Sequence, residues 1–379
     1  MYLHLPVQKG SGMANGTKPT GTRPQWRSSP AFIMAAFVAT ALTGCGGTVD
    51  SGDGQGASGS DGPVRIVVNS GATPGDVVAV SAAIENGADF GLKGSPDDIK
   101  RFDSHSTATQ VLLSGRGDVI SGSLASTLKL IEQGQDIKVF CPIQNATEEV
   151  LVGTGDVRTV EDLKDPKNRL AVDSPGGGAD FFLNFLLNVE DAGFTVKDIP
   201  SKIILEDGDQ RLSAMQNGEA AASILAFQEV EFLKQARGAD DVHEIKILAE
   251  ALGDQSIYVA WGAQSSWLAQ NKDLAARFCA SALDAHRKIG QDFNSYKTIA
   301  DKYIVPPVPE KDLKQLWDLN DEYTVWATDP MISEEQLKAN IKVVAESGLL
   351  NGELAYEDVV DTEVMEAAAE ILQKKGSNQ

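Results

Sequence analysis

The chain of 379 residues carries little positive charge, few aromatic residues and only three cysteines. Its 33 lysines and arginines stand against 54 aspartates and glutamates, which gives a formal net charge of −21. A chain this acidic lacks the clusters of Lys and Arg with which proteins bind phosphates, so no nucleic acid is expected as a partner. The acidity does not fix the sign of a small ligand, because the field inside a pocket can oppose that of the whole protein.

Motifs of several enzyme classes are also missing. The sequence contains no G-x-S-x-G nucleophile elbow and no P-loop. No spacing among His, Cys, Asp and Glu indicates a metal site, so neither a metal nor another cofactor is expected. The acid pair Glu148-Glu149 does not indicate catalysis, because adjacent residues in a strand face opposite ways. Asp207 and Asp209 are interpreted as loop or helix-cap residues.

The N-terminal region has the pattern of a secretory signal. Lys18, Arg23 and Arg27 precede an apolar stretch of 12 residues, 31–42, and small residues then lead to Cys45. A basic region, a short apolar segment and a small-residue cut site are typical of a signal peptide. The apolar stretch is shorter than the roughly 20 residues that span a bilayer, and no second hydrophobic segment reaches that length.

The sequence Leu-Thr-Gly-Cys-Gly around Cys45 resembles a bacterial lipobox. The resemblance implies a signal peptide of residues 1–44, cleavage before Cys45 and acylation of its thiol by a chain such as palmitate. The mature protein would then be held outside the cytoplasmic membrane by its lipid. The alternative is an ordinary buried cysteine after a short apolar helix. Met1 and Met13 are both candidate start residues.

Residues 45–63 are expected to form a flexible tether. Seven of the 17 residues from 46 to 62 are Gly, three are Ser and three are Asp, so the segment has almost nothing to bury. Residues 1–44 hold four basic residues and no acidic one, so cleavage would leave 29 basic against 54 acidic residues, a net charge of −25.

Two cysteines follow the tether, Cys141 and Cys279. Both stand in apolar surroundings, and buried free thiols are the simpler interpretation. A disulfide is the alternative, because an oxidising compartment allows two cysteines to pair.

Short apolar runs alternate with helical patterns along most of the chain. Val64–Val68 predicts a buried strand, and helix–strand steps follow as far as Cys141. The pattern begins again near Glu149 and includes Ile245–Leu252 as a predicted strand, whereas the chain beyond residue 266 is mostly helical. This order predicts an α/β fold of mostly parallel sheets flanked by helices.

Three predicted strands end in loops of Ser and Gly, and a predicted helix follows each loop. Ligands bind at the carboxyl ends of strands in open α/β sheets, where helix N-termini offer unpaired N–H groups and Ser hydroxyls add donors. The predicted ligand contacts are Ser70, Gly71, Ser121, Gly122, Ser123, Ser174, Gly176, Gly177, Gly178, Phe227 and Gln228. Ordinary turn and cap chemistry is the alternative for each loop, and core packing is the alternative for Phe227.

The histidines form no catalytic pattern. His105 is interpreted as a solvated or capping residue, His243 as a loop residue, and His286 as exposed on a helix. The tryptophans of the last third, such as Trp261, are expected in core packing.

Three segments resemble the solute-binding proteins of ABC importers, in the group that serves uptake of nitrate, sulfonates, taurine and thiamine precursors. They are residues 113–119, which step into a strand; 159–172, with Asp-Leu-Lys before a strand; and 211–221, where Ala220 stands in place of the usual aspartate. The resemblance implies a periplasmic-binding-protein type 2 fold, in which two lobes close over a solute. It implies lobe one at 64–146 plus 254–330, lobe two at 147–253 and a C-terminal helical segment at 331–379.

The sequence therefore predicts a monomeric, lipid-anchored, extracytoplasmic solute-binding component of an ABC importer. Its expected partners are ABC permease subunits and a small polar or anionic solute, such as a sulfonate, nitrate or a pyrimidine-like compound. No enzyme is predicted, because the clustered cysteines and histidines of the family's fungal pyrimidine-making relatives are missing. A ligand sensor or non-transport lipoprotein, and an enzyme of pyrimidine metabolism on the same scaffold, are the alternatives.

Overall fold

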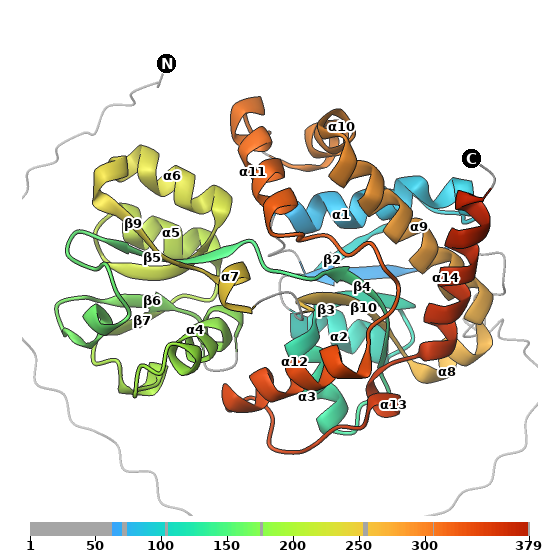
Figure 1. The fold of residues 1–379 in the computed structure, drawn as a ribbon, viewed down its shortest axis with the longest axis horizontal. Helices are drawn as coiled ribbons and strands as arrows, with labels where there is room; N and C mark the ends of the chain where they lie inside the picture. The colour runs from blue at the N-terminus through green and yellow to red at the C-terminus, as the bar shows by residue number, and fades with distance from the viewer. Residues whose placement is uncertain are drawn as a thin grey trace, which may run out of the picture. The chain divides into compact units, whose positions relative to one another are not determined.

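The computed structural model describes residues 63–69, 74–102, 105–174, 177–252, 257–305 and 307–377 (Figure 1). All of them belong to one contact-defined unit of the chain, Gly56–Gln379. The predicted signal peptide, the proposed lipid-carrying Cys45 and the tether up to residue 62 lie outside the described residues.

The first sheet has five strands in the order β2-β1-β3-β10-β4. β1 runs parallel to β2 and β3, whereas β10 runs antiparallel between β3 and β4. Successive side chains of β1 alternate between two helical layers: Ile66 and Val68 pack with α1 and α9, and Val67 packs with α2. The bounds of these elements are β1 (Ile66–Asn69), β2 (Lys100–Phe102), β3 (Val119–Ser123), β4 (Lys138–Gln144), β10 (Val259–Ala263), α1 (Pro74–Glu85), α2 (His105–Leu113), α3 (Leu124–Glu132) and α9 (Lys272–Gln291), with short 3-10 helices at Asn86–Phe90 and Pro96–Asp98.

The second sheet also has five strands, in the order β7-β6-β8-β5-β9. β6 runs parallel to β7 and β8, and β5 runs antiparallel between β8 and β9. Leu170 and Val172 of β6 pack with α4, whereas Ala171 belongs to the cluster that includes residues of α5 and α6. The bounds are β5 (Glu149–Thr154), β6 (Leu170–Val172), β7 (Lys202–Ile204), β8 (Ala222–Ala226), β9 (Val242–Ile247), α4 (Gly178–Val189), α5 (Gly208–Gln216), α6 (Phe227–Arg237) and α7 (Leu248–Leu252), with 3-10 helices at Glu161–Lys164, Val196–Asp198 and Ala239–Asp241.

The chain passes between the two sheets twice. After β4 it leaves the first sheet and enters the second as β5, and after α7 it returns to the first sheet as β10. We call residues 145–149 the first crossing and residues 253–258 the second crossing. The two strands reached by crossing are those that run antiparallel to the rest of their sheet. Two mostly parallel sheets with flanking helices confirm the predicted fold class.

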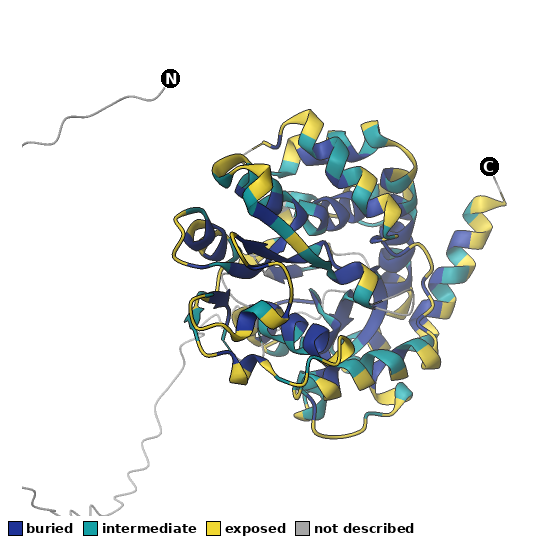
Figure 2. Ribbon diagram, turned by 60° about the vertical axis from the view of Figure 1, so that its left-hand side comes forward, coloured by how far each residue is buried: buried dark blue, intermediate teal, exposed yellow. Residues whose placement is uncertain are grey.

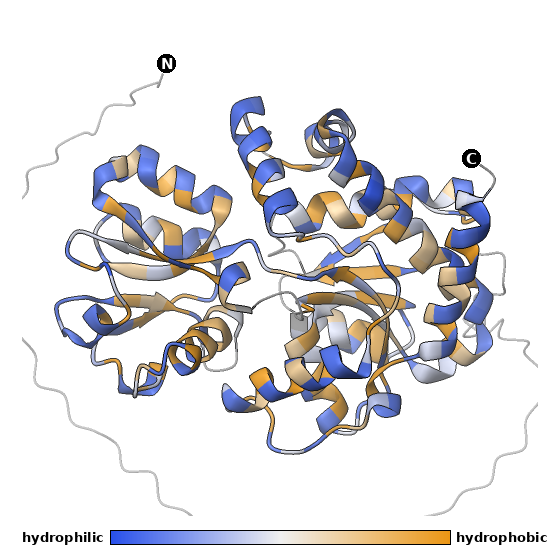
Figure 3. Cartoon of the chain, in the orientation of Figure 1, coloured by the Kyte–Doolittle hydropathy of each residue, from blue (hydrophilic) through white to orange (hydrophobic). Residues whose placement is uncertain are grey.

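Burial follows the alternation of the sequence. Figure 2 shows buried residues on the sheets and on the inner faces of the helices, and Figure 3 shows hydrophobic residues in the same places. Trp261, Phe140 and Phe182 are among the largest fully buried side chains. The expectation that Trp261 belongs to the core is confirmed.

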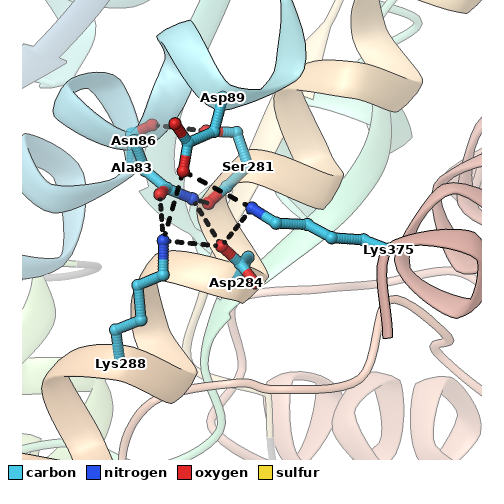
Figure 4. Close-up of polar contacts among 7 residues, drawn as sticks. All are labelled: Ala83, Asn86, Asp89, Ser281, Asp284, Lys288 and Lys375. Carbon is cyan, nitrogen blue, oxygen red and sulfur yellow. Dashed lines mark hydrogen bonds and ion pairs between the residues drawn. The ribbon is translucent and has the colours of Figure 1, made fainter. Parts of the chain in front are cut away.

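The C-terminal region is helical, and its last helix is fixed by charge pairs to helix α9, which packs beside the first sheet. Lys375 of α14 lies 3.0 Å from Asp284 of α9, and Lys288 lies 3.0 Å from the same carboxylate (Figure 4). Asn86 also donates to Asp284, at 3.0 Å. The helices of this region are α8 (Ser265–Gln270), α10 (Phe293–Tyr303), α11 (Glu310–Glu322), α12 (Glu334–Glu346), α13 (Tyr356–Val359) and α14 (Thr362–Gly376).

Cys141 of β4 and Cys279 of α9 form a disulfide, so the expectation of two free thiols is wrong. The two positions are 138 residues apart in sequence. Their apolar contexts indicate burial, but they carry no sign that both residues pack at the same point between β4 and α9.

Three further expectations are corrected. The segment Ile245–Leu252 is not one strand: β9 ends at Ile247, and the Ala- and Leu-rich residues that follow form α7, in keeping with their helix propensity. His243 lies in β9 and not in a loop, with its Nε2 3.0 Å from the Gly155 carbonyl oxygen. His286 is 1% exposed, because the side of α9 that carries it faces the core.

Candidate functional site

Ionisable side chains gather where the chain crosses between the sheets. Glu148 and Glu149 end the first crossing, and Tyr258 ends the second. Burial and the negative charges of Glu149, Asp76 and Glu148 raise the pKa of the Tyr258 phenol. The carboxylates that act on the phenol come from the first crossing and from the first turn of α1. The Tyr258 ring also lies 5.1 Å from the ring of Phe182 on α4.

Glu149 is the most strongly perturbed of these carboxylates. Burial, together with the charges of Glu229 and Asp173, raises its pKa to about 7, against the opposing charge of Arg211. Thr147 donates a hydrogen bond to Glu149 Oε2 at 3.1 Å. We call Glu149, Asp173, Arg211, Glu229 and Tyr258 the crossing site. It unites the first crossing, the end of β6, two helices beside the second sheet and the second crossing.

Arg211 is the one guanidinium of the crossing site, and its donors point at carbonyl oxygens. Its Nη1 donates to the carbonyl oxygens of Leu205 and Glu206 at 3.3 Å each, and its Nε donates to that of Ile224 at 3.4 Å. The side chain is 7% exposed. Arg211 thus ties α5 to the end of β7 and to the middle of β8, and it contributes a buried positive charge.

Carboxylates of the protein itself occupy the helix N-termini near the strand ends. At α4, Asp173 accepts hydrogen bonds from the backbone N–H groups of Ala179 at 3.0 Å and Asp180 at 2.7 Å. At α1, Glu148 accepts from the Gly75 N–H at 3.2 Å. At α6, Glu229 accepts from the Ala226 N–H at 2.7 Å.

Side chains cap two more helix starts, one with a carboxylate and one with a hydroxyl. Asp207 accepts from the Asp209 N–H at 2.8 Å and caps α5, which confirms its interpretation as a cap residue. Ser123 accepts from the Ser126 N–H at 3.2 Å and caps α3. Several N–H groups at these helix starts are therefore already bonded within the chain.

Glycines make room for three of these carboxylates. A Cβ on Gly75 would lie 1.9 Å from Glu148 Oε1, one on Gly177 would lie 2.4 Å from Asp173 Oδ2, and one on Gly208 would lie 2.6 Å from Glu229 Oε1. Real Cβ atoms do not approach other atoms so closely. Each glycine thus lets a carboxylate sit against the first turn of a helix.

The predicted contact residues have mixed positions. Ser121, Gly122 and Ser123 belong to β3, where they pair with β10, so they do not follow the strand as expected. Ser174 follows Asp173 directly, and its N–H lies 3.4 Å from Glu206 Oε2.

The glycines of the third loop lie at the start of α4, and the remaining predicted contacts lie elsewhere. Gly177 is the N-cap of α4 and Gly178 begins it. Ser70, Gly71 and Gly176 lie outside the described residues, as does the side chain of His105.

Phe227 and Gln228 face helix α11. The Phe227 ring is 5% exposed and lies 6.2 Å from the ring of Tyr323 at the end of α11. With Leu316 and Leu319 of α11, both residues line a cavity of about 10 Å³. A cavity of this size holds about one water molecule at most. This geometry indicates that Phe227 is a packing residue.

Sequence reasoning missed the residues of the crossing site. Adjacent side chains face opposite ways, but Glu148 is buried and Glu149 is half-buried at the point where the chain crosses between the sheets. The available signal was two acids between the apolar stretches Val139–Ile143 and Val150–Val152. Asp173, between a strand and a glycine-rich turn, was a second such signal.

Neither a membrane span nor a metal cluster occurs among the described residues. No helix there is long and apolar enough to cross a membrane. No group of three or more His, Cys, Asp and Glu in the described part of the chain is placed to hold a metal ion.

No protein-family model and no curated protein matches this sequence. Solved structures do match. The sulfonate-binding protein assigned to an ABC transporter of Methylobacillus flagellatus is 16% identical, with a TM-score of 0.62 over 83% of this chain and 96% of that one. The periplasmic nitrate-binding protein of Synechocystis is 14% identical, with a TM-score of 0.59 over 82% and 89% of the two chains.

A third match, a Candida albicans protein, is described as having the generic periplasmic binding protein fold. It is 13% identical, with a TM-score of 0.57 over 81% of this chain and 95% of that one. At these identities the likeness is one of fold. The chain thus has the periplasmic binding protein fold that solute-binding proteins of ABC importers also have, as its sequence predicts.

Proposed function

We propose that the protein is the extracytoplasmic, lipid-anchored solute-binding component of an ABC importer. In this proposal a monomer captures a small polar solute and delivers it to permease subunits, without catalysis. Lobe one comprises residues 64–146 and 254–330, lobe two comprises 147–253, and 331–379 is a helical segment appended to lobe one.

The observation that supports this proposal most strongly is the composition of the crossing site. Buried and half-buried ionisable and aromatic side chains from both crossings and from the strand ends meet on a fold whose solved examples include sulfonate- and nitrate-binding proteins. Ligands of α/β folds bind at the carboxyl ends of strands, and perturbed ionisable groups concentrate at functional sites. Ser121, Ser123, Ser174 and Gly177, with Ser70, Gly71 and Gly176, are proposed to contact the solute together with the crossing site.

The proposed location has separate support. The Cys141–Cys279 disulfide is typical of proteins in oxidising compartments. The signal-peptide pattern and the lipobox-like sequence around Cys45 also support an extracytoplasmic location. Replacing Cys45 by Ala should move the protein from the membrane fraction to the soluble extracytoplasmic fraction, and mass spectrometry of the N-terminal peptide should find the acyl chains only in the unaltered protein.

Binding is tested with the mature protein purified from membranes in detergent. Thermal unfolding is followed with sulfonates, nitrate, thiamine precursors, amines and small carboxylates. A ligand at a hundred times its Kd stabilises the folded state by about 2.7 kcal/mol, so one class should raise Tm clearly. Ser174→Trp should abolish that rise, whereas Ser213→Trp, at an exposed position of α5, should leave it unchanged. A well-folded protein whose Tm no class alters would contradict the proposal.

A further inference from the structure

We infer that the solute of the crossing site carries a positive charge, as an ammonium or guanidinium group, and that the site disfavours sulfonate and nitrate. This inference rests on the proposed function and names the class of solute. It departs from the anionic solutes that the sequence led us to expect, and the departure has a structural cause.

The helix N-termini around the crossing site are already occupied. An N-terminus attracts an anion because its first N–H groups are unpaired and its dipole is positive. At α4 and α6, and at the Gly75 N–H of α1, carboxylates of the protein accept these hydrogen bonds. A solute anion would have to displace a buried carboxylate or stand beside it. Two negative charges side by side repel each other strongly in a medium of low dielectric constant.

The charge balance of the crossing site is negative. No ion pair within 4.0 Å involves Glu149, Asp173 or Glu229 in the described part of the chain. Arg211 supplies one positive charge, and its donors are directed at carbonyl oxygens. The internal residues outside the described ranges, 70–73, 103–104, 175–176, 253–256 and 306, include no Lys, Arg or His. The site therefore has three carboxylates for one fixed cation.

Unpaired polar atoms beside the crossings give evidence that is independent of charge. The Tyr296 hydroxyl and both amide atoms of Gln144 have no hydrogen-bond partner among the described residues, although the two side chains are 0% and 1% exposed. The negative charge of Glu148 acts on Tyr296 and adds to burial in raising its pKa, and the Gln144 carbonyl oxygen accepts from the Tyr258 N–H at 2.9 Å. Buried polar groups are rarely left unpaired, so this polar capacity points to a bound molecule.

An amine-bearing solute satisfies both features. Ammonium and guanidinium groups are donors only and match the carboxylate and amide oxygens that these residues present. The half-buried ring of Tyr258 adds an aromatic face, which attracts cations within about 6 Å. A sulfonate or nitrate offers acceptors only and finds Arg211 as its single charged partner.

The test is isothermal titration calorimetry of the mature protein in low salt at pH 8, because the pKa of Glu149 is about 7 and its carboxyl is ionised at that pH. The cationic probes are putrescine, agmatine and choline, and the anionic probes are ethanesulfonate and nitrate. At least one cationic probe should bind, and raising the salt concentration should weaken it. Glu149→Gln and Glu229→Gln should each weaken that probe at least tenfold, because each removes one carboxylate charge. Glu219→Gln, at an exposed residue after α5, should leave Kd within twofold of the original value.

The outcomes separate the two proposals. Binding of ethanesulfonate or nitrate without any cationic probe would overturn the inference and leave the solute-binding function standing. Binding of a cationic probe that neither Glu149→Gln nor Glu229→Gln weakens would also overturn it. A folded protein that binds none of the five probes contradicts the inference, and the proposed function then depends on the wider thermal screen.

Discussion

The backbone N–H of Asp180 donates a hydrogen bond of 2.7 Å to the side-chain carboxylate of Asp173. Asp173 thereby occupies the N-terminus of α4, and its second oxygen accepts from Ala179. The carboxylate is 7% exposed, and burial raises its pKa in spite of these hydrogen bonds. The N-terminus of α4 therefore binds a carboxylate of the protein itself.

Gly177→Ala should destabilise the protein, because the added Cβ would lie 2.4 Å from Asp173 Oδ2. The carboxylate must move and weaken hydrogen bonds to a charged acceptor, each worth roughly 1.5–3 kcal/mol. We expect the free energy of unfolding in urea to fall by roughly 2–4 kcal/mol.

Gly178→Ala is the matched control for this change. Gly178 begins α4, and a methyl group added to it would have no neighbouring atom within 4 Å. Alanine is a better helix former than glycine by up to about 1 kcal/mol, so this variant should be as stable as the original protein or slightly more stable. Equal loss of stability in both variants would contradict the role given to Asp173.

Glu149→Gln should change how stability depends on pH. The Glu149 carboxyl has a pKa of about 7 in the folded protein, where it faces Thr147, Arg211, Asp173, Glu229 and Tyr258, against a usual value of 4.5. Between pH 4.5 and 7 the unfolded chain releases this proton before the folded protein does. The free energy of unfolding therefore falls as the pH rises through this range.

The variant lacks that titration, so it should gain stability relative to the original protein as the pH rises. Urea unfolding of both proteins at pH 5 and pH 8 measures the two differences, with Glu219→Gln as the control. A difference that is the same at both pH values would mean that Glu149 titrates normally.

Removing the disulfide should weaken the protein substantially. It links Cys141 of β4 to Cys279 of α9 over 138 residues, and the chain-entropy account assigns a loop of this length a contribution of about 5 kcal/mol. The double variant Cys141→Ala/Cys279→Ala should unfold at a correspondingly lower urea concentration. A reductant should shift the original protein in the same direction and leave the variant unaffected. An original protein insensitive to reductant under unfolding conditions would show that its cysteines are unpaired.

Local patterns predicted much of the fold but little of the site. Val64–Val68 and the glycine-ended helices after it predict elements correctly, because period and turn chemistry act over a few residues. Ile245–Leu252 was predicted as one strand because Ile247 and Leu248 continue a single apolar run, although β9 ends between them and only the pairing with β5 defines that end.

The crossing site depends on contacts between distant segments. Glu149, Asp173 and Arg211 come together only through the order of strands β6, β8 and β5 in the second sheet. The same holds for Cys141 and Cys279. In each case the residue types were visible in the sequence, but their partners were fixed by topology.

His286 should make the protein lose stability in mild acid. Its Nδ1 lies 2.9 Å from the Ala327 carbonyl oxygen, and burial lowers its pKa to about 4 from the usual 6.5. As the pH falls from 6.5 to 4, the unfolded chain binds a proton at this ring and the folded protein does not, so the free energy of unfolding falls by about 3 kcal/mol. Over the same range, falling pH raises the contribution of Glu149 to the free energy of unfolding, so the two effects oppose each other.

The two effects are separated by variants and by a direct probe. His286→Gln should remove the acid loss, and the double variant with Glu149→Gln should show a flatter stability profile than either single variant. In the folded original protein, the NMR signal of the His286 ring should keep the chemical shift of neutral imidazole down to about pH 5. A ring that titrates near pH 6.5 would place His286 in contact with water and contradict its burial on the core-facing side of α9.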